Sequence, residues 1–201
     1  DLITWYVGLP TSSSHALLGG FGGAAMAHAW KFSGVLQWER FVKTVQYIVV
    51  SPFVGLVLAL ILIIGLLWTF RKALPSKVDR WFRVAQLGSA AAFSLGHGTN
   101  DAQKTMGIVA ALLYATLWKE RQAGFESGEV EFPFWVVLIC HLAIGLGTLC
   151  GGWRIVKTMG LKIAKLRPYS GACAETAAAV SLFGTAYLGI PVSTTHTITG
   201  A

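Results

Sequence analysis

Long stretches without charged residues limit most strongly what this chain can fold into. Five windows lack Asp, Glu, Lys and Arg: Leu2–Trp30, Thr44–Phe70, Val84–Asn100, Phe132–Trp153 and Thr176–Ala201. A helix that crosses a bilayer needs roughly 20 predominantly apolar residues, so several of these windows are long enough. The second window alone would be hard to bury in a small soluble bundle. The sequence therefore predicts an all-α, polytopic membrane helix bundle in contact with the lipid bilayer.

Composition supports this class and excludes others. Hydrophobic residues make up 54% of the 201 and charged residues 12%, and the mean hydropathy is +0.61. A soluble domain usually carries about 25% charged residues. The net charge of +7 does not indicate a nucleic-acid partner, because the basic residues lie in short segments between the apolar windows. Cys140, Cys150 and Cys173 have no metal-ligand spacing, so no metal site or disulfide framework is expected.

The segments between the windows predict the orientation of the helices. Arg71–Arg83 contains five basic residues and one acidic residue, and Arg154–Arg167 contains five basic residues and no acidic one. Lys119–Glu131 contains two basic residues and four glutamates. By the positive-inside rule the first two segments are cytoplasmic and the third is external. Residues 31–43 should then be external as well, despite their small excess of basic residues.

One short motif occurs twice. Gly8-Leu-Pro-Thr-Ser-Ser-Ser-His15 near the start matches Gly189-Ile-Pro-Val-Ser-Thr-Thr-His196 near the end. Three predicted helices, at 44–70, 84–118 and 133–153, separate the copies. Because three is odd, the copies approach the membrane from opposite faces, as in inverted-topology repeats. Gly-x-Pro is poorly tolerated within a spanning helix, so both copies are predicted at the tips of re-entrant hairpins. The predicted divisions are 1–43 (end of the first repeat), 44–83 (connecting helix and loop) and 84–201 (second repeat).

The hydroxyl residues of the two copies are candidate anion ligands. They are Ser12, Ser13, Ser14, Ser193, Thr194 and Thr195. Proline followed by Ser or Thr is typical of a helix start, where unpaired N–H groups and hydroxyls can bind an anion without a charged side chain. Two such tips facing each other suit a compact tetrahedral oxyanion. The alternative is that small hydroxylated residues only allow close helix packing, and a single copy would favour it. The duplication favours the anion site.

A polar segment interrupts the 84–118 window. Gly96-His-Gly-Thr-Asn-Asp101 has two glycines and an Asn-Asp pair, which predicts a broken helix that lines a polar cavity. Asp101 is costly at membrane depth and is therefore a functional candidate. Next to an anion, at about 4 Å and an effective dielectric of about 20, its charge would be repelled by about 4 kcal/mol. A proton or cation that neutralises Asp101 would thus favour anion binding. The alternative is an interfacial helix cap.

Four further polar residues are weaker candidates. Lys104 lies three residues after Asp101 on the same helix face, either as its ion-pair partner or in the place of a monovalent cation. Glu175 lies 18 residues before Ser193, either as a gate or proton carrier or at the headgroup level. His97 and His141 are more typical of hydrogen-bonded interior histidines than of proton shuttles.

Several of these motifs together resemble the Pit-type inorganic phosphate transporter family. They are Gly98-Thr-Asn-Asp101, Glu175 ahead of a hairpin, and Pro191-Val-Ser-Thr-Thr-His196. The resemblance covers nearly the whole chain, as the central part of such a protein. It implies phosphate uptake by an inverted-repeat bundle. Carried over by position, the six hydroxyl residues would bind phosphate, and Asn100 and Asp101 would serve the coupling cation or proton.

Two departures from the family pattern affect this prediction. The family's first Asn-Asp segment would precede Asp1, so the chain is expected to be an excerpt of a longer protein. Many members have Asn-Asp-x-x-Asn, whereas Lys104 takes the last place here. An ammonium there disfavours sodium and resembles the bacterial, proton-coupled branch, whose substrate can be a neutral divalent metal–phosphate complex. We therefore expect proton-coupled phosphate symport by alternating access in the bacterial inner membrane, with sodium coupling as the alternative. No cofactor is expected, and homo-oligomerisation is left open.

Two functions of other classes fit parts of this pattern. An intramembrane Ser/His hydrolase would use similar residue types, but no Gly-x-Ser-x-Gly elbow occurs, and duplication of the whole cluster is unusual for one catalytic centre. The chain is therefore not expected to be an enzyme. An anion channel is not excluded by the sequence, and uphill accumulation of the substrate would distinguish it from a transporter.

Overall fold

The computed structural model describes the whole chain except residues 1, 31–33, 35, 119–131 and 164–165. Every regular element in the described part is helical, which confirms the all-α class. In chain order the elements are α1 (Leu2–Val7), α2 (Ser13–Ala29), α3 (Trp38–Thr69), α4 (Pro75–Thr116), α6 (Phe134–Lys157), the π-helix η2 (Thr158–Ile163), α7 (Pro168–Tyr187) and α8 (Thr194–Gly200).

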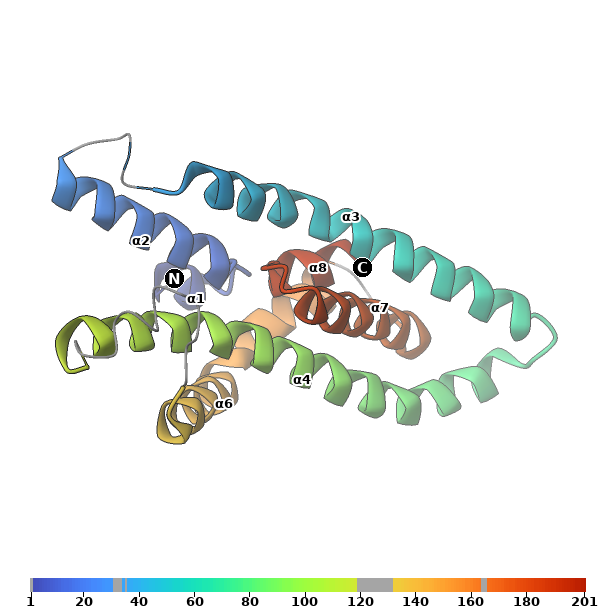
Figure 1. The fold of residues 1–201 in the computed structure, drawn as a ribbon. Coiled ribbons are helices and arrows are strands. Elements are labelled where there is room, and N and C mark those ends of the chain that lie inside the picture. The colour runs from blue at the N-terminus through green and yellow to red at the C-terminus, as the bar shows by residue number, and fades with distance from the viewer. Residues whose placement is uncertain (1, 31–33, 35, 119–131, 164–165) are drawn as a thin grey trace.

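The two longest helices, α3 and α4, run antiparallel, and α7 lies between them with α8 beside it (Figure 1). The side of α7 that packs on these neighbours consists almost entirely of small residues, which allow helices to approach closely. Its buried residues are Gly171, Ala172, Cys173, Ala174, Ala177, Ala178, Ala179, Ser181 and Leu182. Helix α6 packs on the other side of α4 through a small cluster of Ala102, Met106, Val136 and Cys140. This arrangement holds the α7–α8 hairpin at the centre of the molecule.

Two helices of the described part are long and apolar enough to cross a membrane, namely the segments Phe41–Thr69 and Phe134–Leu161. Most of their large apolar side chains are exposed, for example Ile61 and Ile64 on α3 and Leu149 on α6. Water would disfavour so much contiguous apolar surface, whereas lipid accepts it. The exposed sides of α3 and α6 therefore have the surface expected of helices that face a bilayer.

Helix α3 has small residues and a proline where α8 packs closely against it. Pro52 lies inside α3 and lacks the N–H group that would otherwise bond the carbonyl of Ile48. The hydroxyl of Ser51 donates to that carbonyl instead, at 3.0 Å. One turn further on, Gly55 lies so close to α8 that a Cβ atom there would collide with the carbonyl oxygen of Thr197. The small residues of α3 thus allow backbone-to-backbone contact with α8.

The predicted break in the 84–118 helix is wrong. Helix α4 is continuous from Pro75 to Thr116 and passes through residues 96–101 without unwinding. The polar side chains bond within the helix: Thr99 Oγ1 donates to the carbonyl of Leu95 at 2.9 Å, and Asn100 Nδ2 donates to that of Gly96 at 3.0 Å. Gly96 permits close packing instead, because a Cβ there would lie 3.3 Å from Cβ of Leu182.

The helix ends also differ from the predicted ones. Helix α4 begins at Pro75, so most of the basic segment Arg71–Arg83 forms its first turns rather than a loop. Helix α6 continues into η2 up to Ile163 instead of ending at 153. The acidic segment Lys119–Glu131 lies outside the described residues. The predicted orientation, the inverted topology and the three-part division of the chain stay predictions.

Candidate functional site between the two hairpin tips

The two copies of the repeated motif have the same backbone conformation. We call residues 8–15 the first tip and residues 189–196 the second tip. Gly8 (φ 77°) and Gly189 (φ 66°) are both left-handed, a conformation that glycine adopts without steric cost. The following N–H groups, of Leu9 and Ile190, each donate to the carbonyl five residues earlier at 2.8 Å. This is the Schellman pattern that ends a helix, and it directs both chains into the tips in the same way.

Both tips also start their second helix identically. Ser12 (φ −84°, ψ 115°) is the N-cap of α2, and Ser193 (φ −90°, ψ 112°) is the N-cap of α8. Each serine Oγ accepts a hydrogen bond from the backbone N–H of the histidine three residues later, His15 at 3.4 Å and His196 at 3.3 Å. The predicted helix starts at the two motifs are thus confirmed.

The two tips meet. Oγ of Ser12 lies 2.7 Å from Oγ of Ser193, and both residues are buried. The rings of His15 and His196 are also neighbours, with their centroids 4.7 Å apart. The predicted tip-to-tip arrangement is present, and it brings together hydroxyl groups that are 181 residues apart in sequence.

Asp101 of α4 faces both tips. Ser13 Oγ donates to Oδ2 of Asp101 at 3.0 Å, and Thr194 Oγ1 donates to the same oxygen at 3.4 Å. Ser13 and Thr194 hold the same place in their tips. The side chain of Asp101 is 14% exposed, so this carboxylate is largely removed from solvent. One acid therefore contacts the two tips through equivalent hydroxyls.

Lys104 completes the cluster. Its Nζ donates to Oδ1 of Asp101 at 3.1 Å, to Oγ of Ser14 at 2.6 Å and to the carbonyl of Val192 at 2.9 Å. An ammonium has three protons to donate, so one goes to the acid and one to each tip. The predicted ion pair with Asp101 is present, and the charges of the two side chains balance each other.

A histidine of α4 borders this cluster. Nδ1 of His97 lies 3.8 Å from Oδ2 of Asp101, beyond hydrogen-bonding distance, and the ring stacks on Phe93. Among the buried side-chain nitrogens and oxygens of the described residues, this Nδ1 has no hydrogen-bond partner. His97 therefore faces the carboxylate without being bonded to it.

Three of the predicted site residues make different contacts. Asn100 is buried, and its Nδ2 donates to Gly96 on α4 and, at 3.5 Å, to the carbonyl of Leu182 on α7. Thr195 Oγ1 donates to the carbonyl of Thr11 at 3.4 Å, across the tip contact. Glu175 lies on α7 away from the tips. The roles proposed for these residues from sequence stay predictions.

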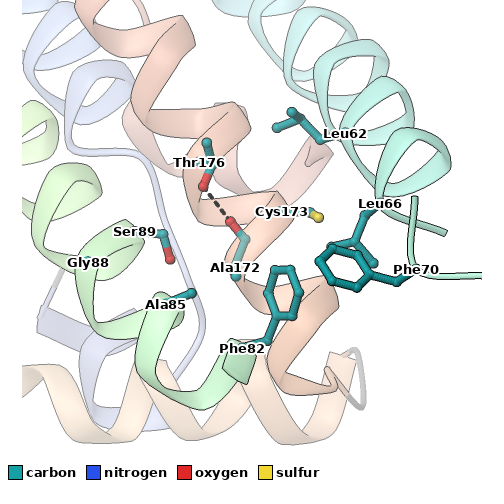
Figure 2. A pocket seen from close by; sticks show the side chains of 10 residues that line it. All are labelled: Leu62, Leu66, Phe70, Phe82, Ala85, Gly88, Ser89, Ala172, Cys173 and Thr176. Carbon is teal, nitrogen blue, oxygen red and sulfur yellow. Dashed lines mark hydrogen bonds between the residues drawn. The ribbon is translucent and has the colours of Figure 1, made fainter. Parts of the chain in front are cut away.

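The partners of Glu175 lie on α4, beside a cavity. Ser89 Oγ donates to Glu175 Oε2 at 2.6 Å, and Gln86 Nε2 donates to Oε1 at 3.4 Å. Ser89 also lines a cavity of about 370 Å³ between α3, α4 and α7 (Figure 2). Its walls are mostly apolar, with Leu62 and Phe82 among them, and the hydroxyl of Thr176 is bonded to Ala172 of its own helix. This cavity lacks the donors of an anion site.

A second cavity, of about 300 Å³, reaches the tips. Ser14, Lys104 and Val192 line one part of it, and apolar residues such as Phe21 of α2 and Ile48 of α3 line the rest. Lys104, whose ammonium joins the two tips, is therefore part of the cavity wall. It is a candidate route to the cluster.

Sequence reasoning missed one feature of the site and expected another. The carbonyl of Val192 as a partner of Lys104 has no sequence signal, because every residue carries a carbonyl. The pairing of His15 with His196 did have one, since both histidines occupy the same place in the repeated motif.

Comparison with known proteins gives a consistent result. The "Phosphate transporter family" matches residues 1–201. A "Probable low-affinity inorganic phosphate transporter" of Rhizobium meliloti is 54% identical over 201 residues, and one of Bacillus subtilis is 40% identical; each match covers 100% of this chain and 58% of the relative. The chain thus spans less than two thirds of the length of these relatives. A protein of the same name from Mycobacterium tuberculosis is 38% identical over 205 residues, which is 46% of its length.

A solved structure shows the same fold. The chain described as "The sodium-dependent phosphate transporter" superimposes with a TM-score of 0.78 at 22% identity, over 100% of this chain and 65% of that one. The family and the named relatives are transporters and not enzymes, which sets the hydrolase alternative aside. Such a family makes the chain part of an integral membrane protein. With a family match over its whole length and a resemblance already visible in its tips, the chain belongs to the phosphate transporter family.

Proposed function

We propose that this chain forms the binding site of an inorganic phosphate transporter and that phosphate binds where the two tips meet. The observation that carries the proposal is the contact of Ser12 with Ser193 at 2.7 Å, which places equivalent donors from both repeats around one point. The hydroxyls of Ser13 and Thr194 lie beside it. The names of the family and the curated relatives support phosphate as the substrate.

Phosphate suits this site because it is a compact tetrahedral anion that accepts several hydrogen bonds. The hydroxyls of Ser12 and Ser193 bond each other, and a phosphate that enters between them replaces this bond with one bond from each serine. Lys104 offers a positive charge on the same side. Hydrogen bonds to a charged group contribute about 1.5–3 kcal/mol each. The hydroxyls of Ser12 and Ser193 would therefore donate to the anion, and the charge of Lys104 would attract it, because the hydroxyl protons of Ser13 and Thr194 go to Asp101.

Phosphate would reach the tips through the cavity of about 300 Å³ that Lys104 helps to line. We propose that the two tips then separate in turn toward the two sides of the membrane, in alternating access. Separation of the tips breaks the contacts of Lys104 with Ser14 and with Val192, which belong to different repeats. The named relatives are bacterial, which supports the bacterial inner membrane as the location.

We propose a proton rather than sodium as the coupling ion. Sodium prefers a set of neutral and anionic oxygens, and the described structure offers Asp101 Oδ1, Ser14 Oγ and the Val192 carbonyl as such a set. The ammonium of Lys104 occupies the centre of these oxygens. A monovalent cation has no room there while Lys104 is present. A neutral divalent metal–phosphate complex stays a second form of the substrate to test.

Uptake of radiolabelled phosphate into vesicles that contain the intact native protein tests this proposal. An imposed pH gradient without sodium should drive accumulation above the external concentration, which a channel cannot do. Ser193→Ala should lower the apparent phosphate affinity about tenfold or more, since it removes a bond to an anion. Thr148→Ala is the matched control, because the hydroxyl of Thr148 bonds only its own helix on α6. Absence of uptake without sodium would rule out proton coupling. An unchanged apparent phosphate affinity in Ser193→Ala would rule out the proposed phosphate site.

A further inference from the structure

The proposed phosphate site uses neither histidine of the two tips as a ligand. His15 and His196 occupy equivalent places, three residues after their N-cap serines. Their ring planes are tilted by 48°, with 4.7 Å between the centroids. His15 is exposed and His196 is half-buried, so the pair extends from the surface to the serine contact.

His196 is joined to the two serines by a continuous line of polar atoms. Its Nδ1 lies 2.8 Å from Oγ of Ser193, which in turn lies 2.7 Å from Oγ of Ser12. Ser193 Oγ also accepts the backbone N–H of His196. A hydroxyl has one proton and can donate to one partner only. The protonation state and the tautomer of His196 therefore decide where the hydroxyl proton of Ser193 points.

When His196 is neutral with a bare Nδ1, the hydroxyl of Ser193 donates to the ring. The hydroxyl of Ser12 then donates to Ser193, and both protons are used within the protein. When His196 is protonated, both ring nitrogens carry hydrogen and Nδ1–H donates to Ser193 Oγ. The hydroxyl of Ser193 then turns away from the ring, and those of Ser12 and Ser193 are both free to donate to an anion.

We propose that the coupling proton binds to the His15–His196 pair, on His196, and that its arrival reverses the Ser193–His196 hydrogen bond so that Ser12 and Ser193 donate to phosphate. This inference rests on the proposed function and names the residues that couple proton and phosphate. Because coupling between two binding sites is reciprocal, phosphate in turn favours the proton on His196. Return of the proton to water on the other side of the membrane restores the resting bonds and weakens phosphate binding.

The charges around the pair support this assignment. Helix α4 presents Asp101, Lys104 and His97 to the tips, and the charges of Asp101 and Lys104 already balance. The part of α3 that packs on α8, within residues 44–69, carries no charged residue. Arg154 of α6 contacts the carbonyl of Tyr6 at the base of the first tip, and Glu175 of α7 is held by Ser89. The proton on His196 is thus the charge that accompanies the anion.

Two neighbouring histidine rings can take up and transfer the coupling proton better than one ring can. Both cannot easily be charged at 4.7 Å, because like charges at short distance repel, so the pair takes up a single proton. The exposed ring of His15 receives the proton from water and passes it to the half-buried ring of His196. His15 belongs to the first tip and His196 to the second, so separation of the tips interrupts this route.

Two transport assays on vesicles with the intact native protein test the inference. The first measures accumulation of phosphate driven by a pH gradient, and the second measures exchange of internal for external phosphate without a gradient. His196→Gln should reduce accumulation about tenfold or more, the size of an ordinary coupling, and should reduce exchange at saturating phosphate less than it reduces accumulation. His15→Gln should slow accumulation in the same direction. His141→Gln is the matched control, because its ring is exposed on α6 and bonds only Val137 of its own helix.

A spectroscopic measurement shows whether His196 takes part in proton coupling or only in packing. In ¹⁵N NMR spectra of histidine-labelled protein near neutral pH, addition of inorganic phosphate should change Nδ1 of His196 from an acceptor to a protonated nitrogen. The inference is overturned if Nδ1 stays unprotonated, if His196→Gln accumulates phosphate normally, or if this variant loses exchange together with accumulation. If the unchanged protein moves no phosphate in either assay, the proposed function itself fails, and this inference with it.

Discussion

Ser13 and Thr194 hold the same place in two copies of one motif, and their hydroxyls both donate to Oδ2 of Asp101, at 3.0 and 3.4 Å. The carboxylate is therefore shared between the two tips. Any motion that moves one tip away from the other changes the bonding of Asp101. Asp101 and its partner Lys104 thus form the α4 side of the site, and the two tips form the other side.

The ion pair of Asp101 with Lys104 should matter for stability as well as for transport. Asp101→Asn leaves the ammonium of Lys104 without its partner in a largely buried position, 19% exposed. Breaking a buried pair in this way costs about 3 kcal/mol. We expect a lower thermal unfolding midpoint in detergent and loss of phosphate uptake. Asp79→Asn, a half-buried position in the first turns of α4, is the control.

A double substitution distinguishes the two effects. Asp101→Asn combined with Lys104→Met removes both charges, so it should recover much of the lost stability, because neither charge is left unpaired. Uptake should not recover, since the positive charge next to phosphate is also gone. A double variant that transports phosphate normally would show that the pair has no part in the site.

Lys104→Asn should make uptake respond to sodium. The substitution removes the ammonium from between Asp101 Oδ1, Ser14 Oγ and the carbonyl of Val192, and adds an amide oxygen. Such a set of oxygens suits a hard cation. Initial rates of phosphate uptake in sodium and in choline buffers should differ for this variant and agree for the unchanged protein. Lys104→Met adds no oxygen ligand and should show no sodium stimulation; equal stimulation of both variants would contradict the argument.

Gly55→Ala should destabilise the contact of α3 with α8. The added Cβ would collide with the carbonyl oxygen of Thr197, a backbone atom that cannot turn aside. Overpacking of this kind costs about 1–3 kcal/mol. Gly65→Ala in the same helix meets no atom within 4 Å and should be neutral or slightly stabilising, since alanine favours helix. Thermal unfolding of both variants in one detergent measures the difference, and equal midpoints would refute the close contact.

The sequence predicted the tips better than the helix between them. The helix starts at Ser12 and Ser193 follow from local chemistry, because proline and hydroxyl residues favour a helix N-terminus whatever surrounds them. The meeting of the tips followed from duplication of the motif. The predicted break at Gly96 failed because local propensity ignores tertiary contacts. Asn100 bonds within α4 and to α7, and Gly96 makes room for Leu182, so the helix stays whole.

The sequence does not predict which residues far apart in the chain are in contact. Glu175 was singled out, and it does lie on the helix before the second tip, but its partners Gln86 and Ser89 are 89 and 86 residues away on α4. Nothing in either segment indicates that they meet. The same holds for the bond of Lys104 with the carbonyl of Val192, which depends on how α4 packs against the second tip.

Anomalous scattering from crystals of the native protein grown with arsenate, a close analogue of phosphate, tests the central claim most directly. The account predicts an arsenic peak between Ser12 and Ser193, with their hydroxyl oxygens moved apart and each about 3 Å from an arsenate oxygen. Arsenic bound elsewhere, with these two oxygens still bonded to each other, would contradict it.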